Sequence, residues 1–157
     1  MSLSRRAVAG LAALGALAFI HPLAAQQGGI AVEQPWARAA IKGGTGGAFL
    51  TLRNTGSQPD RLISASTPLA RSTEVHETVR DGEVMRMRPV AGLEVPPGGS
   101  VTLRPGGAHL MMMGLTEALR PGTTLPLTLT FEHAGKVELQ VPVQAAGATA
   151  PAMQHQH

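Results

Sequence analysis

Cysteine is absent from this chain of 157 residues. Without a thiol, the protein forms no disulfide and performs no thiol redox chemistry. It also cannot build a blue-copper electron-transfer centre, because that centre requires a thiolate ligand. The absence of one residue type therefore excludes several classes of function.

Runs of basic residues are also absent. The formal net charge is +3, and it falls to +1 once Arg5 and Arg6 are removed with the leader described below. A nearly neutral chain of about 130 residues gives no reason to expect nucleic acid or an acidic membrane surface as a partner. It is long enough to bury one ordinary core.

No hydrophobic run is long enough to span a membrane comfortably. The longest, over residues 7–20, has fourteen residues, whereas a span needs about twenty. Arg5 and Arg6 precede it, and the small residues Ala24 and Ala25 follow. This layout predicts a secretory signal peptide over residues 1–25 and export to the periplasm or cell-envelope space. The Ser4-Arg5-Arg6 start resembles a twin-arginine signal, so the Sec and twin-arginine routes both remain open, and an uncleaved anchor is the alternative.

Helical periodicity is missing beyond the leader, and short alternating runs between glycines and prolines take its place. The clearest runs are LPLTLTF and VELQVPV, joined by a hairpin loop over 132–136. Further strands are expected at about 30–34, 47–53, 60–66, 73–80, 83–89, 100–104 and 109–115. The pattern predicts an all-β sandwich or barrel forming a single domain over residues 26–144. From Ala145 the composition predicts a flexible tail, residues 145–157, with nothing to pack.

The segment TEVHETVRDGEVMRMRP indicates a tight hairpin, with Asp81-Gly82 as its two-residue turn. That turn would make His76 and Met87 direct cross-strand partners on one face, with Cβ atoms about 5 Å apart. Local geometry alone would then bring an imidazole and a thioether together.

The segment AHLMMMGL places three of the seven methionines in a row. On a strand, His109, Met111 and Met113 share one face, and Met112 points to the other. Met112 is therefore expected in the core. If this strand lies beside the hairpin, two histidines and two methionines surround one metal ion. Met85 and Met113 lie on the ligand face of their strands and are expected to form a hydrophobic rim, with a role as reserve ligands as the alternative.

Four neutral donors, two of them thioethers, match Cu(I) best. Soft sulfur selects Cu(I), and imidazole tolerates it. Zinc favours thiolate, imidazole or carboxylate, and calcium or magnesium needs oxygen ligands. Only the two imidazoles take up protons near neutral pH, so the site should release copper in acid.

The spacing His76, ten residues, Met87, twenty-one residues, His109, one residue, Met111 is that of the H-x10-M-x21-H-x-M motif. On this motif, and on PWARA, GAFLTLRNTG and GGAHLMMMGL, the chain resembles the PCu(A)C family of periplasmic copper chaperones over about residues 30–143. The resemblance implies a cupredoxin-like, immunoglobulin-like β-sandwich that binds Cu(I) at an exposed site through the four motif residues. It also implies delivery to the Cu(A) centre of cytochrome c oxidase subunit II, directly or through another copper chaperone, by a monomer that is not an enzyme.

The last residues, Met153, His155 and His157, form a short histidine- and methionine-containing tract. Such tracts bind metals, and imidazole nitrogen suits Cu(II) better than thioether sulfur does. We therefore expect a possible second metal site there, for Cu(II), with a frayed terminus as the alternative. Of the other notable residues, Trp36 is expected in the core and His133 in a solvated loop.

Three other functions compete with copper delivery. Copper sequestration without an oxidase partner is the first, although one compact site and one short tail argue against bulk storage. A copper enzyme is the second, and the absence of a nucleophile–base pair argues against it. A metal-free adhesion or interaction sandwich is the third, and only the motif opposes it.

Overall fold

The computed structural model describes residues 25–152, and all but Ala25 of the expected signal peptide, together with the tract 153–157, lies outside them. The described chain folds into eleven strands joined by turns. They are β1 (Ala25–Gln27), β2 (Ile30–Arg38), β3 (Gly46–Asn54), β4 (Asp60–Ser66), β5 (Ala70–Asp81), β6 (Val84–Pro89), β7 (Leu93–Val95), β8 (Ser100–Leu103), β9 (His109–Leu115), β10 (Thr124–Phe131) and β11 (Gly135–Gln144). Within this part of the chain, no helix is long and apolar enough to cross a membrane.

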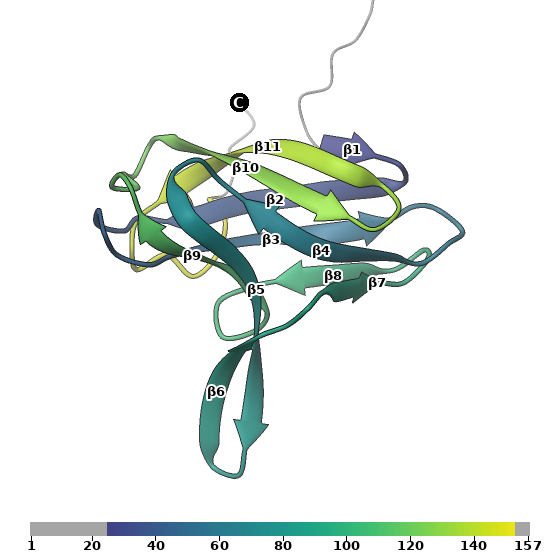
Figure 1. Cartoon of the computed structure of the whole chain (residues 1–157), viewed down its shortest axis with the longest axis horizontal. Coiled ribbons are helices and arrows are strands. Elements are labelled where there is room, and N and C mark those ends of the chain that lie inside the picture. The colour runs from purple at the N-terminus through teal and green to yellow at the C-terminus, as the bar shows by residue number, and fades with distance from the viewer. Residues whose placement is uncertain (1–24, 153–157) are drawn as a thin grey trace, which may run out of the picture.

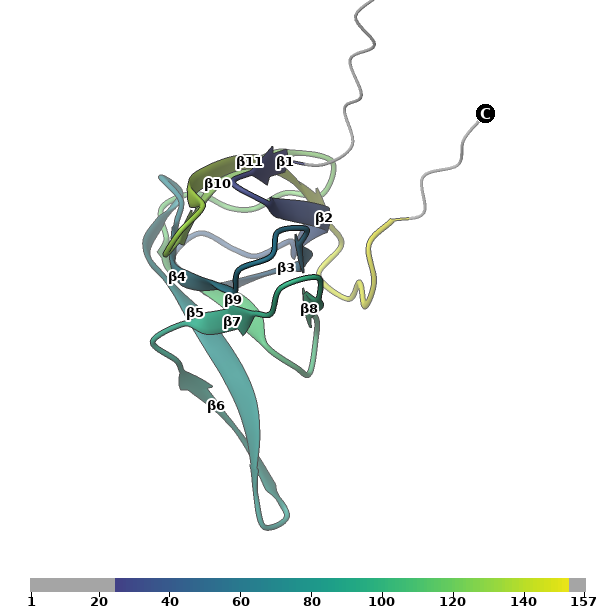
Figure 2. The same ribbon diagram turned by 90° about the vertical axis from the view of Figure 1, so that its right-hand side faces the viewer.

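The strands form one mixed sheet that folds over on itself into two layers (Figures 1 and 2). Its order is β6-β5-β9-β3-β2-β11-β10-β4-β7, with β1 added to β2 and β8 added to β3. All pairs are antiparallel except β11 with β2, which run parallel through a short contact at Val143 and Gln144. The expected all-β, single-domain sandwich is confirmed.

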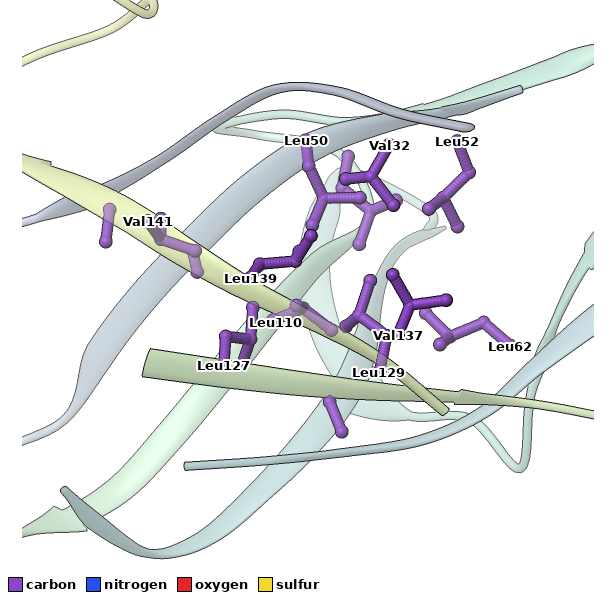
Figure 3. Close-up of a cluster of buried hydrophobic side chains, with 14 of the residues drawn as sticks. Val32, Leu50, Leu52, Leu62, Leu110, Leu127, Leu129, Val137, Leu139 and Val141 are labelled. Carbon is purple, nitrogen blue, oxygen red and sulfur yellow. The ribbon is translucent and has the colours of Figure 1, made fainter. Parts of the chain in front are cut away.

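The core lies between the two layers and is built by strict alternation (Figure 3). In β10, the side chains of Leu125, Leu127, Leu129 and Phe131 are each at most 2% exposed, and the residues between them face outward. Each such side chain contributes about 1.5–3 kcal/mol when it leaves water. The strands predicted from alternation are all present, whereas the three-residue strands β1 and β7 were not predicted.

A buried carboxylate fastens β4 to the β10–β11 loop. Asp60 accepts backbone N–H bonds from Arg61 at 2.7 Å and from His133 and Ala134 at 2.9 Å each. Burial by itself raises the pKa of Asp60, but these three donors outweigh it, and the pKa lies below its ordinary value. The side chain of His133 is exposed in this loop, as expected.

One extra residue in β2 changes which side chains face the core. Glu33 pairs with Thr51 and Trp36 pairs with Phe49, so β2 advances three residues while β3 advances two. Gln34, in this bulge, has a φ of 48°. The bulge reverses the alternation, so that Ala37 faces the core and Trp36 lies on the outer face of the β2–β3 pair.

The β5–β6 hairpin extends beyond the sandwich (Figures 1 and 2). Its register differs from the expected one, because Asp81 pairs with Val84 and the two-residue turn is Gly82-Glu83. Gly82 has a φ of 65°, whereas Glu83 has no positive φ, which matches a type II′ turn with glycine at its first position. The prediction that His76 and Met87 pair directly is therefore wrong.

Candidate metal centre

The centre of the candidate site is a pair of histidines on neighbouring strands. His76 of β5 and His109 of β9 are direct antiparallel partners, and their ring centroids lie 5.7 Å apart. Each residue is 8% exposed. They lie on the outer face of the sheet, because their neighbours Val75 and Leu110 point into the core.

The ring of His109 is held by the main chain. Its Nδ1 lies 3.0 Å from the carbonyl oxygen of Gly107. A carbonyl only accepts, so Nδ1 carries the proton and donates, and Nε2 of the neutral ring keeps its lone pair. Metal-binding histidines are typically oriented in this way by a backbone carbonyl.

The ring of His76 is held by a carboxylate. Its Nε2 donates to Oε2 of Glu74 at 2.9 Å, and Nδ1 is buried with no hydrogen-bond partner. An unpaired buried nitrogen costs about 1–3 kcal/mol relative to a satisfied one. A metal ion bound at Nδ1 would satisfy it, so this orphaned atom fits a metal ligand. Sequence reasoning missed Glu74, although its position two residues before His76 places both on one strand face.

Met111 continues the same face of β9. It is half-buried and lies opposite Glu74 of β5 on one side and Gly47 of β3 on the other. A Cβ at Gly47 would lie 3.2 Å from Cζ of Phe49. The glycine therefore lets the ring of Phe49 pack against the backbone beside Met111.

Met87 stays on the ligand face despite the changed register. It pairs with Thr78, and His76 pairs with Pro89, so His76 and Met87 are diagonal neighbours instead of direct partners. A shift by two positions preserves the face of a strand, whereas a shift by one would reverse it. Met87 is 59% exposed, on the hairpin that projects from the sandwich.

A groove of about 520 Å³ joins these elements. Met87, His109 and Met111 line it, and His76, which is not part of the lining, is the cross-strand partner of His109. The structure therefore places the four motif residues on one continuous face, three of them on the groove wall. Within residues 25–152, no three histidine, aspartate or glutamate side chains gather closely enough to hold a metal, so a site here depends on the methionines.

The remaining methionines separate as their strand faces predict. Met112 is fully buried in the core, as expected. Met113 is half-buried on the outer face opposite Ser72, outside the groove lining. Met85 is 59% exposed and lines the groove beside Met87.

Aromatic rings extend from His109 along the outer face of the sheet. Phe49 lies 6.5 Å from His109 and 4.6 Å from Trp36, centroid to centroid. Trp36 is 3% exposed, so its expected burial is confirmed, but it lies outside the main core cluster. The guanidinium carbon of Arg38 is 5.5 Å from the centroid of Phe49. The contacts of Trp36 and Arg38 with Phe49 escaped sequence reasoning because they depend on the β2 bulge, and the contact of Phe49 with His109 escaped it because the two residues lie on strands far apart in the sequence.

The segment 145–152 also contacts the domain. Nε of Arg38 donates to the carbonyl oxygen of Ala148 at 2.7 Å, and Ala146 lines the groove. With its amide oriented to satisfy both neighbours, Gln144 donates to the carbonyl of Ala150 and accepts from the N–H of Ala152. Residues 145–152 thus make a few contacts with the domain although most of them are exposed, and the flexibility of the tail stays a prediction.

Comparison with known proteins identifies this type of domain. The chain is 28% identical to the copper-bound PCuAC domain from PmoF2, with a TM-score of 0.66 over 80% of this chain and 99% of that one. The CuI-DR1885 structure from Deinococcus radiodurans is 32% identical, with a TM-score of 0.56 over 70% of this chain and 76% of that one. The fold is thus that of a PCuAC-type β-sandwich, the family that the sequence resembles.

Sequence relatives give the same placement. The model of the family described as "Putative lipoprotein LpqE-like" matches residues 30–143, and the chain belongs to this family. "Putative lipoprotein Lxx21020" from Leifsonia xyli subsp. xyli is 35% identical over 120 residues, which are 76% of this chain and 72% of the relative.

Proposed function

We propose that this protein is an extracytoplasmic Cu(I) chaperone whose ligands are His76, Met87, His109 and Met111. The observation that carries the proposal is the histidine pair beside the methionine-lined groove. One buried ring nitrogen in that pair has no partner. The similarity to the copper-bound PCuAC domain from PmoF2 supports copper as the cargo, and the similarity to CuI-DR1885 supports the Cu(I) state.

The donor set suits Cu(I) by its softness and charge. Two thioethers and two neutral imidazoles offer no negative charge to balance a divalent ion, whereas a monovalent soft ion matches them. The carboxylate of Glu74 contacts His76 and adds a negative charge beside the site. That charge, held by a residue outside the proposed ligand set, partly balances the charge of a bound Cu(I) ion.

We further propose that the copper is delivered to the Cu(A) site of cytochrome c oxidase subunit II, directly or through another copper chaperone. Neutral thioether ligands let the ion pass to thiolates of higher affinity by stepwise ligand exchange. Met87 supports this role because it is 59% exposed on a projecting hairpin, where a partner can approach. In this proposal the protein acts as a monomer, catalyses no reaction, and is exported by the leader over residues 1–25.

The test is a Cu(I) titration of the protein lacking residues 1–25, with X-ray absorption to count sulfur and nitrogen ligands. We expect one tightly bound Cu(I) with two sulfur and two nitrogen neighbours, and transfer to an apo Cu(A) domain. Binding that survives alanine replacement at each of the four positions would reject the site. Binding without transfer, in a strain whose deletion impairs growth only at high copper, would favour sequestration.

The tract Met153, His155 and His157 is proposed as a second site, for Cu(II). Two truncations test it: one ends after Ala152 and keeps Ala146 in the groove lining, and the other ends after Gln144 and removes Ala146 together with the contact from Arg38 to Ala148. Loss of one Cu(II) equivalent in both truncations, with the Cu(I) site intact in the first, is the expected result. Unchanged Cu(II) stoichiometry in the first truncation would reject the tail site.

A further inference from the structure

The β5–β6 hairpin carries a thioether that the four-ligand site does not use. Met85 lies two residues before Met87 on the same face of β6, is 59% exposed, and lines the same groove as Met87, His109 and Met111. It is absent from the hydrophobic core cluster. A side chain this exposed on a projecting hairpin contributes little to the core, so its sulfur is accessible from the groove.

The opposite face of the hairpin is occupied by charges that pair with one another. Arg86 lies 3.7 Å from Asp81, and Arg88 lies 3.5 Å from Glu77. The soft donors of β6 lie on the other face, where Arg80 of β5 is the direct partner of Met85. From the sandwich toward the turn, that face of β6 presents Met87 and then Met85.

We propose that Met85 is a transfer ligand, which binds Cu(I) as the ion leaves the four-ligand site and passes it toward a partner at the hairpin turn. The inference rests on the proposed function and names the exit path from that same site. A bond from copper to one resident ligand breaks as the bond to the Met85 sulfur forms. Copper stays in the +1 state, and no proton moves, because a thioether binds without deprotonation.

A resident ligand is one of the four residues that hold copper at rest, and its loss lowers the Cu(I) affinity. Loss of a transfer ligand instead lowers the rate at which copper leaves. Met85→Leu keeps the apolar volume of the side chain and removes the sulfur. Affinity depends on the resident site, so the Cu(I) dissociation constant should change by less than about twofold. The rate of transfer to an apo Cu(A) domain or to a Cu(I) chelator should fall about tenfold, because the exit step loses its soft donor.

Met113→Leu is the matched control, because Met113 shares the outer face but does not line the groove. It should alter neither affinity nor rate. An unchanged transfer rate in Met85→Leu would overturn the proposal. An affinity loss as large as that of Met87→Leu would also overturn it, because Met85 would then be a resident ligand.

Methyl NMR of the wild-type protein gives an independent readout. With less than one equivalent of Cu(I), the Met85 methyl signal should broaden or shift while that of Met113 stays fixed. A Met85 signal that never moves would contradict the inference. If the wild-type protein binds no Cu(I), the chaperone function itself fails; if it binds and transfers Cu(I) but Met85→Leu transfers equally fast, only the transfer ligand fails.

Discussion

His76 and His109 face each other across β5 and β9 with ring centroids 5.7 Å apart, yet a different acceptor orients each ring. A side-chain carboxylate, that of Glu74, holds His76, and a backbone carbonyl, that of Gly107, holds His109. A side-chain acceptor can be removed by substitution, whereas a backbone carbonyl cannot. The contact that orients His76 can therefore be removed by mutation while the contact that orients His109 stays in place.

Removing the carboxylate of Glu74 should weaken copper binding without touching a ligand. In Glu74→Ala, His76 loses the acceptor that fixes its tautomer, and we expect Cu(I) affinity to fall about tenfold. Glu74→Gln keeps an oxygen acceptor and should recover part of the loss. Competition titration measures the affinity, and nitrogen-15 NMR of the metal-free protein reports the tautomer.

Glu77→Gln is the control for this series, because Glu77 contacts Arg88 on the other face of the hairpin. It should leave both the affinity and the His76 tautomer unchanged. If Glu74→Ala keeps the same tautomer and the same affinity, Glu74 has no positioning role.

Substitutions at Met111 and Met112 should separate copper binding from stability. Met112 is fully buried, so Met112→Ala should lower the free energy of unfolding by about 2–5 kcal/mol. Met111→Leu keeps the apolar volume on the half-buried outer face and should cost less than about 1.5 kcal/mol while removing one sulfur ligand. Denaturant unfolding and Cu(I) titration of both variants check this, and comparable copper affinity in the two variants would count against Met111 as a ligand.

Asp60→Asn should destabilise the sandwich. Oδ2 of Asp60 accepts from the N–H of Ala134, and Oδ1 accepts from those of Arg61 and His133. An amide nitrogen in place of one oxygen would put one N–H donor against another, which should lower the free energy of unfolding by about 1–3 kcal/mol. Asp81→Asn, on the exposed hairpin, is the control and should change stability by less than about 0.5 kcal/mol.

The same carboxylate makes stability depend on pH. Its pKa in the folded state lies below the ordinary value of 3.8, so its contribution is complete above that value and is lost as the pH falls through the folded-state pKa. The free energy of unfolding of the wild-type protein should therefore decrease in that acid range more steeply than that of Asp60→Asn. Parallel curves for the two proteins would show that Asp60 does not contribute to the dependence.

Trp36 should report copper binding by fluorescence. It is the single tryptophan of the chain, and Phe49 contacts both its ring and that of His109. A change in charge and packing at His109 should reach the indole, so its emission should change until one equivalent of Cu(I) is bound. His109→Ala should abolish the change, and an emission that ignores copper in a protein shown to bind it would contradict this coupling.

Local patterns predicted most of the strands and the strand faces of the site. Alternation over LPLTLTF and VELQVPV predicts β10 and β11, because one face of each strand packs on the core. Strands of three residues, such as β7, are too short for alternation to be recognised. The opposite strand faces of Met111 and Met112 likewise follow from the two-residue period alone.

Features that depend on distant segments could not be predicted in this way. The pairing of His76 with His109 joins β5 and β9 across thirty-two intervening residues, and no local signal encodes it. The hairpin register depended on which residue takes the positive φ, and Gly82 takes it at the first turn position instead of the second. Contacts of the segment 145–152 involve single backbone carbonyls, which composition does not reveal.

The bulge at Gln34 makes the direction of the Trp36 side chain depend on the number of residues in β2. Side chains along a strand point alternately to its two faces. Whether Trp36 points to the core or to the outer face therefore depends on whether the number of residues between it and Val32, the last core residue before the bulge, is odd or even. Deleting one residue there would leave the composition of the strand almost unchanged, yet it would exchange the directions of the indole and of Ala37. Among related chains, therefore, the number of residues between Val32 and Trp36 should predict whether the tryptophan packs on Phe49 at the outer face better than residue identity does.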